Sequence, residues 1–144
     1  MSKSNTFEND LLKLIFNATA IANLADNAAS APLTNLYVSL HTNDPGEAGV
    51  QTTNECAYVD YARITVARTS GGWTIAGNSV SPTTTLSGII AGAGTTPETA
   101  TYAAIGTALT GAGKILYSGA LSPTIAIDDG VTPQITTSST ITEE

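Results

Sequence analysis

Cysteine and charge are scarce in this chain of 144 residues, and long apolar runs are missing. The single cysteine, Cys56, excludes an intramolecular disulfide framework and any zinc site built from several thiolates. Five Lys and Arg against twelve Asp and Glu give a net charge of −7. Proteins that bind nucleic acid need a basic surface to neutralise phosphates, and this chain lacks the residues to form one. No apolar run approaches the roughly 18 residues of a membrane-spanning helix. The polar start of the chain is not typical of a signal peptide. We therefore expect a soluble protein made in a cytoplasm, with no nucleic acid and no membrane as a partner.

Only 12% of the residues are charged, about half of the roughly 25% that is usual for globular proteins. Thr, Ala, Ser and Gly take the place of the missing charges. Threonine favours a pleated, half-buried surface and disfavours helix interiors. A surface with so little charge suits a chain that stays docked on something, although an ordinary acidic β-domain has the same composition.

The segment before Pro32 has the pattern of a helix. No Gly or Pro occurs from Phe7 to Ala29. Spacings of three and four place apolar residues on one stripe, with Leu12 and Phe16 beside it: Leu11, Ile15, Ala18 and Ala22. Thr6 or Asn5 can cap the start, and the segment 28–32 ends the helix because the residue before Pro32 resists the helical region. The pattern predicts a helix of about four to six turns.

After Pro32 the pattern changes to short strands separated by turns. In the expected strand Tyr61–Arg68, the side chains of Ile64 and Val66 should face inward, and those of Arg63 and Thr65 outward. Asp128-Asp129-Gly130 reads as a hairpin-type turn between the last two strands. The expected strands are Asn35–His41, Tyr61–Arg68, Trp73–Ala76, Thr83–Ile90, Thr101–Ile105, Lys114–Leu121, Thr124–Ile127 and Gln134–Ile141.

Strands of this length and spacing predict a mainly β fold, an antiparallel β-sandwich or jelly roll with an N-terminal α-helix. Residues 1–31 would form a helical arm, and residues 32–144 the sandwich domain. No helical pattern recurs between the strands, which disfavours a parallel βαβ fold.

One glycine-rich stretch, from Gly106 to Lys114, superficially resembles a phosphate-binding loop. Ala108 stands where the first glycine is needed, and Ile115 stands where a magnesium-binding Ser or Thr is needed. The residues that follow look like a strand rather than a helix. The stretch is therefore predicted to be a loop between two strands.

Residues that could carry catalysis are isolated. His41 is the only histidine, and its place near a strand end predicts a solvated side chain. Cys56 is expected to be a small buried apolar residue. Asp and Gly form turns, so the acidic loops at 44–47 and 128–130 are not predicted to bind a metal. No spacing selects a catalytic pair from the acids at these positions: Asp44, Glu47, Glu55 and Asp60. We expect no enzyme, no cofactor and no metal.

Interaction residues are the remaining candidates. Tyr58 and Tyr61 could form part of a binding patch, while Trp73 and Tyr117 are expected to pack in the core. On the helix the candidates are the apolar residues Phe7, Leu11, Ile15 and Phe16.

A longer series of motifs resembles a known family. The motifs are LYVSLHTNDPGE (36–47), YVDYARI (58–64), RTSGGWT (68–74), AIGT (104–107) and GAGKILYSGAL (111–121). In this order they resemble a family of small virion proteins of tailed bacteriophages, and the similarity covers about residues 33–143. Members are described both as tail-fibre-like proteins and as head decoration or cement proteins.

The resemblance implies a structural role without catalytic residues. Our main expectation is a protein that decorates and cements the capsid exterior, as a homodimer or homotrimer. The N-terminal helix would either be an arm that contacts the major capsid protein or a second copy, or cover one open face of the sandwich. The alternative is a tail-fibre or baseplate component for host attachment, which would favour a trimer and a receptor-binding loop around Tyr58 and Tyr61. The Ser/Thr-rich stretches 79–85 and 136–142 could add strands at subunit edges.

Two functions outside virion structure are less well supported by the residues. A carbohydrate-binding sandwich would need an exposed aromatic platform, for which the chain has few spare aromatic residues. A hydrolase is the least supported, since there is one histidine, no nucleophile elbow and no paired acids.

Overall fold

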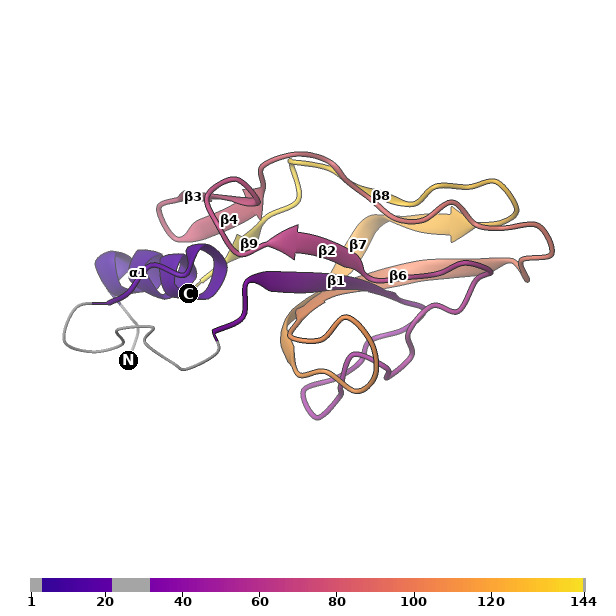
Figure 1. Ribbon diagram of the computed structural model, residues 1–144, viewed down its shortest axis with the longest axis horizontal. Coiled ribbons are helices and arrows are strands. Elements are labelled where there is room, and N and C mark those ends of the chain that lie inside the picture. The colour runs from indigo at the N-terminus through magenta and orange to yellow at the C-terminus, as the bar shows by residue number, and fades with distance from the viewer. Residues whose placement is uncertain (1–3, 22–31, 144) are drawn as a thin grey trace. The chain divides into compact units, whose positions relative to one another are not determined.

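The computed structural model describes residues 4–21 and 32–143 (Figure 1). The chain forms two compact units. The first unit is built from Met1–Asn35, Ala67–Leu86 and Ile135–Glu144, and the second from Leu36–Val66 and Ser87–Gln134. In the described residues the elements are α1 (Asn5–Asn17), β1 (Asn35–His41), β2 (Ile64–Ala67), β3 (Trp73–Ala76), β4 (Ser79–Pro82), β5 (Leu86–Ser87), β6 (Glu98–Gly106), β7 (Ile115–Ile127), β8 (Gln134–Ile135) and β9 (Ile141–Thr142). The fold is mainly β with antiparallel pairing and one N-terminal helix, as the sequence predicts. The stacking into a sandwich and the domain boundary at residue 31 stay predictions.

Helix α1 begins and ends at residues that the sequence pattern did not indicate. Ser4, rather than Thr6 or Asn5, is the N-cap, and its Oγ accepts a hydrogen bond from the Phe7 N–H at 3.4 Å. The helix ends at Asn17 because Ala18 takes a left-handed conformation with φ 53°, and the Thr19 N–H then bonds to the Lys13 carbonyl. The predicted helix was therefore too long, and its last part, residues 22–31, lies outside the described residues.

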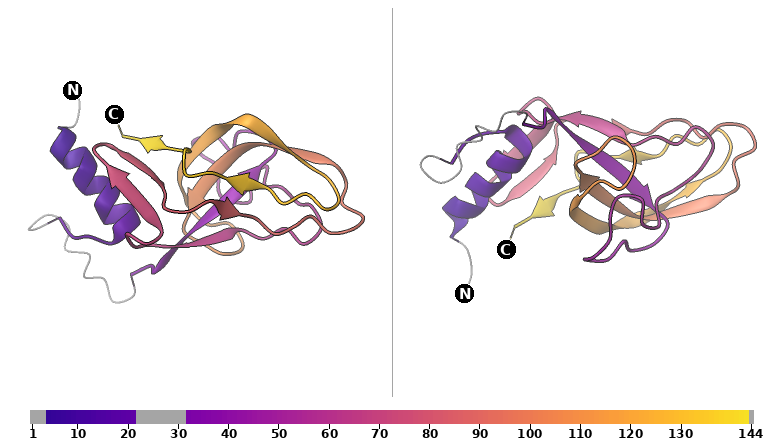
Figure 2. Two further views of the ribbon diagram at one scale, coloured as in Figure 1. Left: turned by 90° about the horizontal axis from the view of Figure 1, so that it is seen from above. Right: turned by 60° about the horizontal axis from the view of Figure 1, so that its bottom comes forward.

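The first unit packs α1 against β3 and β4 (Figure 2). Leu12 and Phe16 supply the buried face of the helix, and the Phe16 ring meets the Trp73 ring edge-on at a centroid distance of 4.8 Å. The guanidinium of Arg68 donates to the carbonyls of Leu14 and Ile15 near the end of the helix. These contacts fasten the helix to its own unit.

Strand β4 is the central strand of the three-stranded sheet β3-β4-β9. On one side Trp73 pairs with Pro82, and on the other Val80 pairs with Ile141. The expectation that residues 79–85 offer a free edge is therefore wrong for Ser79 and Val80, because both of their edges are occupied within the chain. Of residues 136–142, Ile141 and Thr142 are already used to pair with β4.

The second unit contains most of the sheet β2-β1-β6-β7. Antiparallel pairing puts Val38 beside Ile105 and Leu40 beside Ala103, and the alternate residues Leu36, Val38 and Leu40 are buried. Two predicted strands, 114–121 and 124–127, are one strand, β7. Its register with β6 shifts between Ala100 and Tyr102, where β7 has extra residues, and the period-2 pattern breaks at that point.

The predicted turn at Asp128-Asp129-Gly130 is present, but it does not close a hairpin. The Val131 N–H bonds to the Asp128 carbonyl at 3.0 Å, as a turn requires. The strands on its two sides have other partners, since β7 pairs with β6 and β8 pairs with β5. The turn residues were read correctly, and the pairing that they were taken to specify was wrong.

Candidate interaction surface

His41 is a buried residue of the second unit, so the prediction of a solvated side chain was wrong. None of its surface is exposed, because an antiparallel bridge joins it to Glu55 and brings residues 50–56 across the end of β1. Its Nδ1 lies 2.8 Å from the Thr53 carbonyl and its Nε2 lies 2.9 Å from the Ser39 Oγ. Burial lowers the pKa of this imidazole.

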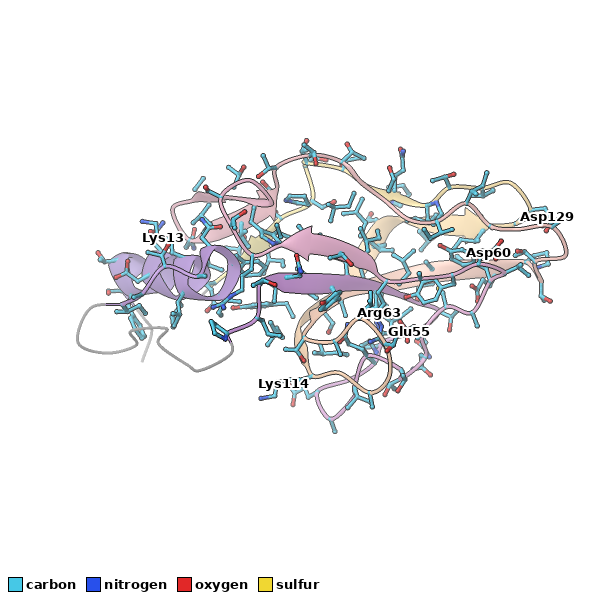
Figure 3. The ribbon with its side chains drawn as sticks, viewed as in Figure 1. Lys13, Glu55, Asp60, Arg63, Lys114 and Asp129 are labelled. Carbon is cyan, nitrogen blue, oxygen red and sulfur yellow. The ribbon has the colours of Figure 1, made fainter. Side chains whose placement is uncertain are left out.

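Arg63 and Glu55 form a buried ion pair beside it (Figure 3). Arg63 Nε and Nη2 donate to the two Glu55 carboxylate oxygens at 2.6 and 2.8 Å, and the Tyr61 hydroxyl donates to Oε1 at 2.8 Å. The other guanidinium bonds go to the carbonyls of Ala108 and Gly111 at 2.9 and 2.7 Å. Arg63 was expected to face outward, and it is buried because the glycine-rich loop closes over it.

The glycine-rich loop is confirmed as a connection between two strands, β6 and β7. The fully buried Gln51 side chain passes beneath it, accepts from the Ala108 N–H at 3.0 Å and donates to the Tyr37 carbonyl. A Cβ at Gly106 or Gly113 would come within 2.1 Å of Gln51 atoms. The glycines therefore make room for a glutamine rather than for a phosphate. These internal contacts have a structural role. We call the residues that make them the polar network, in which three side chains are buried and two are partly buried: His41, Gln51 and Arg63, and Glu55 and Tyr61.

A second group of loops in the same unit, residues 57–61, 87–97 and 128–133, is joined by hydrogen bonds, and we call it the loop cluster. The Tyr58 hydroxyl donates to the Ile89 carbonyl at 3.1 Å, and the Gly92 N–H donates to the Val59 carbonyl at 3.0 Å. The third loop is joined through Ala91, whose N–H donates to the Val131 carbonyl and whose carbonyl accepts from the Gly130 N–H, both at 2.8 Å.

Two carboxylates, those of Glu98 and Asp129, reinforce the loop cluster through hydrogen bonds to its backbone. The Glu98 carboxylate at the start of β6 accepts from the N–H groups of Ala57 and Tyr58 at 3.0 and 2.9 Å. The Asp129 carboxylate accepts from the N–H groups of Gly94 and Thr95 at 3.2 and 2.8 Å. Charged acceptors make stronger hydrogen bonds than neutral ones, so these loops have a defined backbone conformation.

Three large apolar side chains are exposed on this scaffold. Val59, Ile89 and Ile90 leave 40%, 47% and 55% of their surface open. Asp60, beside Val59, has a left-handed backbone with φ 68°, and Figure 3 shows it at the same end of the unit as Asp129. A Cβ at Gly92 would overlap the Asp60 and Val59 side chains, so both lie directly over this glycine. A rigid group of loops that exposes apolar side chains is a candidate for binding.

The structure places the six predicted interaction residues in different surroundings. Phe16 is fully buried and Tyr58 is 4% exposed, while Phe7 is at the border of exposure and Leu11 and Ile15 are partly covered. Tyr61 packs edge-on against Tyr58 at a centroid distance of 5.1 Å, so these two residues do lie together. Their part in binding a partner stays a prediction.

Sequence reasoning missed the exposed residues Val59, Ile89 and Ile90. Ile89 and Ile90 were included in an expected strand, 83–90, and were therefore read as strand residues. The signal that could have separated them is the pair of glycines at 88 and 92, which brackets the two isoleucines as a loop.

Reactive side chains and metal ligands do not gather in the described part of the chain. Cys56 is buried, as predicted, and burial together with Glu98 raises the pKa of its thiol to about 12, so it is mostly the unreactive thiol at neutral pH. Residues 4–21 and 32–143 contain no group of three or more His, Cys, Asp or Glu side chains that could hold a metal ion. The helix that the structure describes is neither long nor apolar enough to span a membrane.

Comparison with known families gives the chain its context. Residues 2–142 match the family described as Podophage GP4 fiber I protein gp80. The chain belongs to this family. It is therefore a fibre component of a tailed-phage virion, which confirms the resemblance to tailed-phage virion proteins. A fibre family implies a structural rather than an enzymatic role, and it favours the fibre expectation over the capsid-cement expectation. No curated protein matches the sequence.

Proposed function

We propose that this chain is a non-catalytic tail-fibre component that helps to attach the phage to its host. The observation that carries the proposal is the fibre-family match, which spans residues 2–142 and hence nearly the whole chain. The internal use of the polar network supports a structural role, because its Arg63 and Glu55 groups bind one another and the loop backbone.

The loop cluster is the part of the chain that we propose to contact the host. Its backbone is held by the hydrogen bonds of Tyr58, Glu98 and Asp129, so it can present Val59, Ile89 and Ile90 without first becoming ordered. A surface that is ordered before binding loses less conformational entropy when a partner docks.

Location in the virion tests this function directly. An antibody against the purified chain should label the tail when intact particles are imaged by negative stain, and antibody fragments should slow adsorption to host cells. Preimmune fragments at the same concentration are the control. Label spread over the head would overturn the tail-fibre proposal and restore the capsid-cement interpretation.

Self-association is a second part of the proposal, since phage fibres are commonly threefold. We expect the purified chain to sediment as a trimer in analytical ultracentrifugation. A chain that stays monomeric throughout the micromolar range would contradict this part, and it would leave the tail location to be decided by the antibody.

A further inference from the structure

The loop cluster exposes both apolar and acidic side chains. Its large apolar side chains are Val59, Ile89 and Ile90, and we call these three residues the apolar centre. Its acidic side chains are Asp60, Asp128 and Asp129, which are all exposed on loops of the same cluster, and we call these three residues the acidic border. Residues 57–61, 87–97 and 128–133 contain no Lys or Arg, since the basic residues of the chain are Lys3, Lys13, Arg63, Arg68 and Lys114.

The hydrogen bonds of the acidic border come from backbone N–H groups. Asp129 accepts from two backbone N–H groups, and Asp128 Oδ1 accepts from the Asp129 N–H at 2.8 Å. No cation within the loop cluster offsets these carboxylates. Three carboxylates with no basic side chain in the cluster give this surface a negative field through which a partner approaches.

This charge pattern excludes several occupants. A second copy would bring the same acidic border against this one and be repelled. Polysaccharides rich in phosphate or carboxylate carry charge of the same sign. A neutral sugar would need an open aromatic face, whereas Tyr58 is buried and packs edge-on with Tyr61.

We propose that the loop cluster binds a protein on the host surface that presents Lys and Arg side chains around an apolar centre. This inference rests on the proposed attachment function and names the chemical class of the receptor. Apolar contact at the centre would supply binding energy, and charge complementarity at the border would speed the encounter and select the partner. Because the apolar centre consists of three side chains, several copies on one fibre would have to bind together to hold a virion.

The test uses phage particles whose fibre gene carries single substitutions. Ile90→Asp puts a charge into the apolar centre and should lower the adsorption rate constant by about tenfold or more. Its matched control is Leu109→Asp, because Leu109 is 50% exposed on the glycine-rich loop outside the loop cluster. The control should adsorb within about twofold of wild type.

Charge is tested with Asp60→Asn, which keeps a residue type that tolerates the left-handed backbone. This variant should adsorb about two- to threefold more slowly at low salt, and the difference should shrink at high salt because screening removes the steering. Glu47→Gln, an exposed acid in the 42–54 loop, is the control and should not change the rate.

The class of partner is tested on the cells. Mild protease treatment of the host should abolish adsorption, while chemical oxidation of surface glycans should leave it unchanged. The reverse result would identify a polysaccharide receptor and overturn the inference, as would normal adsorption by both Ile90→Asp and Asp60→Asn particles.

Antibody labelling of each variant keeps the two proposals separate. Label on the head would defeat the attachment function itself. Label on the tail combined with unchanged adsorption would defeat only the receptor class. If Ile90→Asp is not incorporated into virions, Ile90→Ser takes its place with the same expected direction.

Discussion

Arg63 shows how a buried charge can be held when its guanidinium makes four hydrogen bonds to acceptors of the same chain. Its guanidinium reaches both carboxylate oxygens of Glu55 and two backbone carbonyls of the glycine-rich loop. A buried pair of this kind contributes little compared with well-packed apolar residues, but it becomes a large liability when one partner is removed. Replacing only one of the two residues should therefore lower the stability of the protein strongly.

Glu55→Gln should lower the free energy of unfolding of the second unit by about 3–5 kcal/mol, because it leaves the Arg63 charge buried without a counter-charge. Urea denaturation followed by circular dichroism measures the change. Glu47→Gln, which replaces an exposed acid in the same unit, should change it by less than about 0.5 kcal/mol. Equal effects of the two variants would show that the ion pair is not buried as described.

His41 makes stability depend on pH. Its pKa is lowered in the folded chain, so the unfolded chain binds a proton first as the pH falls below the ordinary value of 6.5. The stabilisation is present above that pH and is lost as the pH falls from 6.5 towards the lowered value. Glu55 and Arg63 act on this ring in opposite directions, the first raising and the second lowering its pKa.

We therefore expect the melting temperature of the wild type to fall between pH 7.5 and 5.5 by more than that of His41→Gln. The variant should be less stable at pH 7.5, since it cannot reproduce both hydrogen bonds of the ring. The comparison cancels the carboxylates that both chains share. Parallel pH dependences in the two chains would contradict the assignment.

The sequence predicted the burial or exposure of some side chains correctly and of others wrongly. Burial of Trp73 and Cys56 followed from their apolar character and is confirmed. His41 and Arg63 were misplaced because alternation along a strand reports which face a residue is on, not what covers that face. The covering segments, residues 50–56 and the glycine-rich loop, come from elsewhere in the chain.

The end of helix α1 has a residue, Ala18, whose substitution can raise the stability of the protein. Ala18 holds a left-handed conformation that costs a residue with a Cβ about 1–2 kcal/mol. Ala18→Gly should therefore raise the free energy of unfolding by about 0.5–1 kcal/mol, after the greater entropy of glycine in the unfolded chain is included.

The matched control is Ala76→Gly, on the exposed side of β3 in the same unit. A glycine in an ordinary strand should lower stability by about 0.5–1 kcal/mol, so the two substitutions have opposite signs. Calorimetric melting of both variants checks this. Destabilisation by Ala18→Gly would mean that the helix does not end at this residue.

The types of the elements were easier to predict than their ends. The alternation of residues 35–41 and 73–76 gave strands with the correct boundaries. The apolar spacing of the helix continues beyond Asn17, so nothing in it marks the left-handed turn at Ala18. The glycines at 88 and 92 indicate a loop, but the apolar residues between them favoured a strand. The exposed residues Ile89 and Ile90 of the loop cluster were therefore assigned to the expected strand 83–90.

On the scale of the whole chain, the two units are built from segments far apart in the sequence. In the first unit β9 supplies one edge of the three-stranded sheet, and the Asn78 side chain donates to the Glu143 carbonyl at 2.9 Å. The last residues of the chain thus complete a sheet whose other strands lie some sixty residues earlier.

Deleting residues 137–144 should expose one edge of β4 and speed amide hydrogen exchange in residues 73–82 by about tenfold or more, because local opening becomes easier. Exchange in β1 and β6 of the second unit serves as the internal control and should change little. Ile141→Ser, which keeps the backbone pairing, should have a smaller effect. Unchanged exchange in β4 would contradict the role of β9.

Composition and motif order predicted the class of the protein well, since low charge, β-patterned segments and the absence of a catalytic set all fit a structural virion component. They did not predict the division into two units, because that depends on which distant segments meet. Nor did they separate fibre from capsid; the family match over residues 2–142 favours the fibre.

The aromatic residues are distributed so that each unit has its own optical reporter. The single tryptophan, Trp73, is buried against Phe16 in the first unit, and all five tyrosines (Tyr37, Tyr58, Tyr61, Tyr102 and Tyr117) belong to the second. Light absorbed by indole alone therefore reports the first unit, and phenol absorbance reports the second. One unlabelled sample can show whether the two units melt together or in succession.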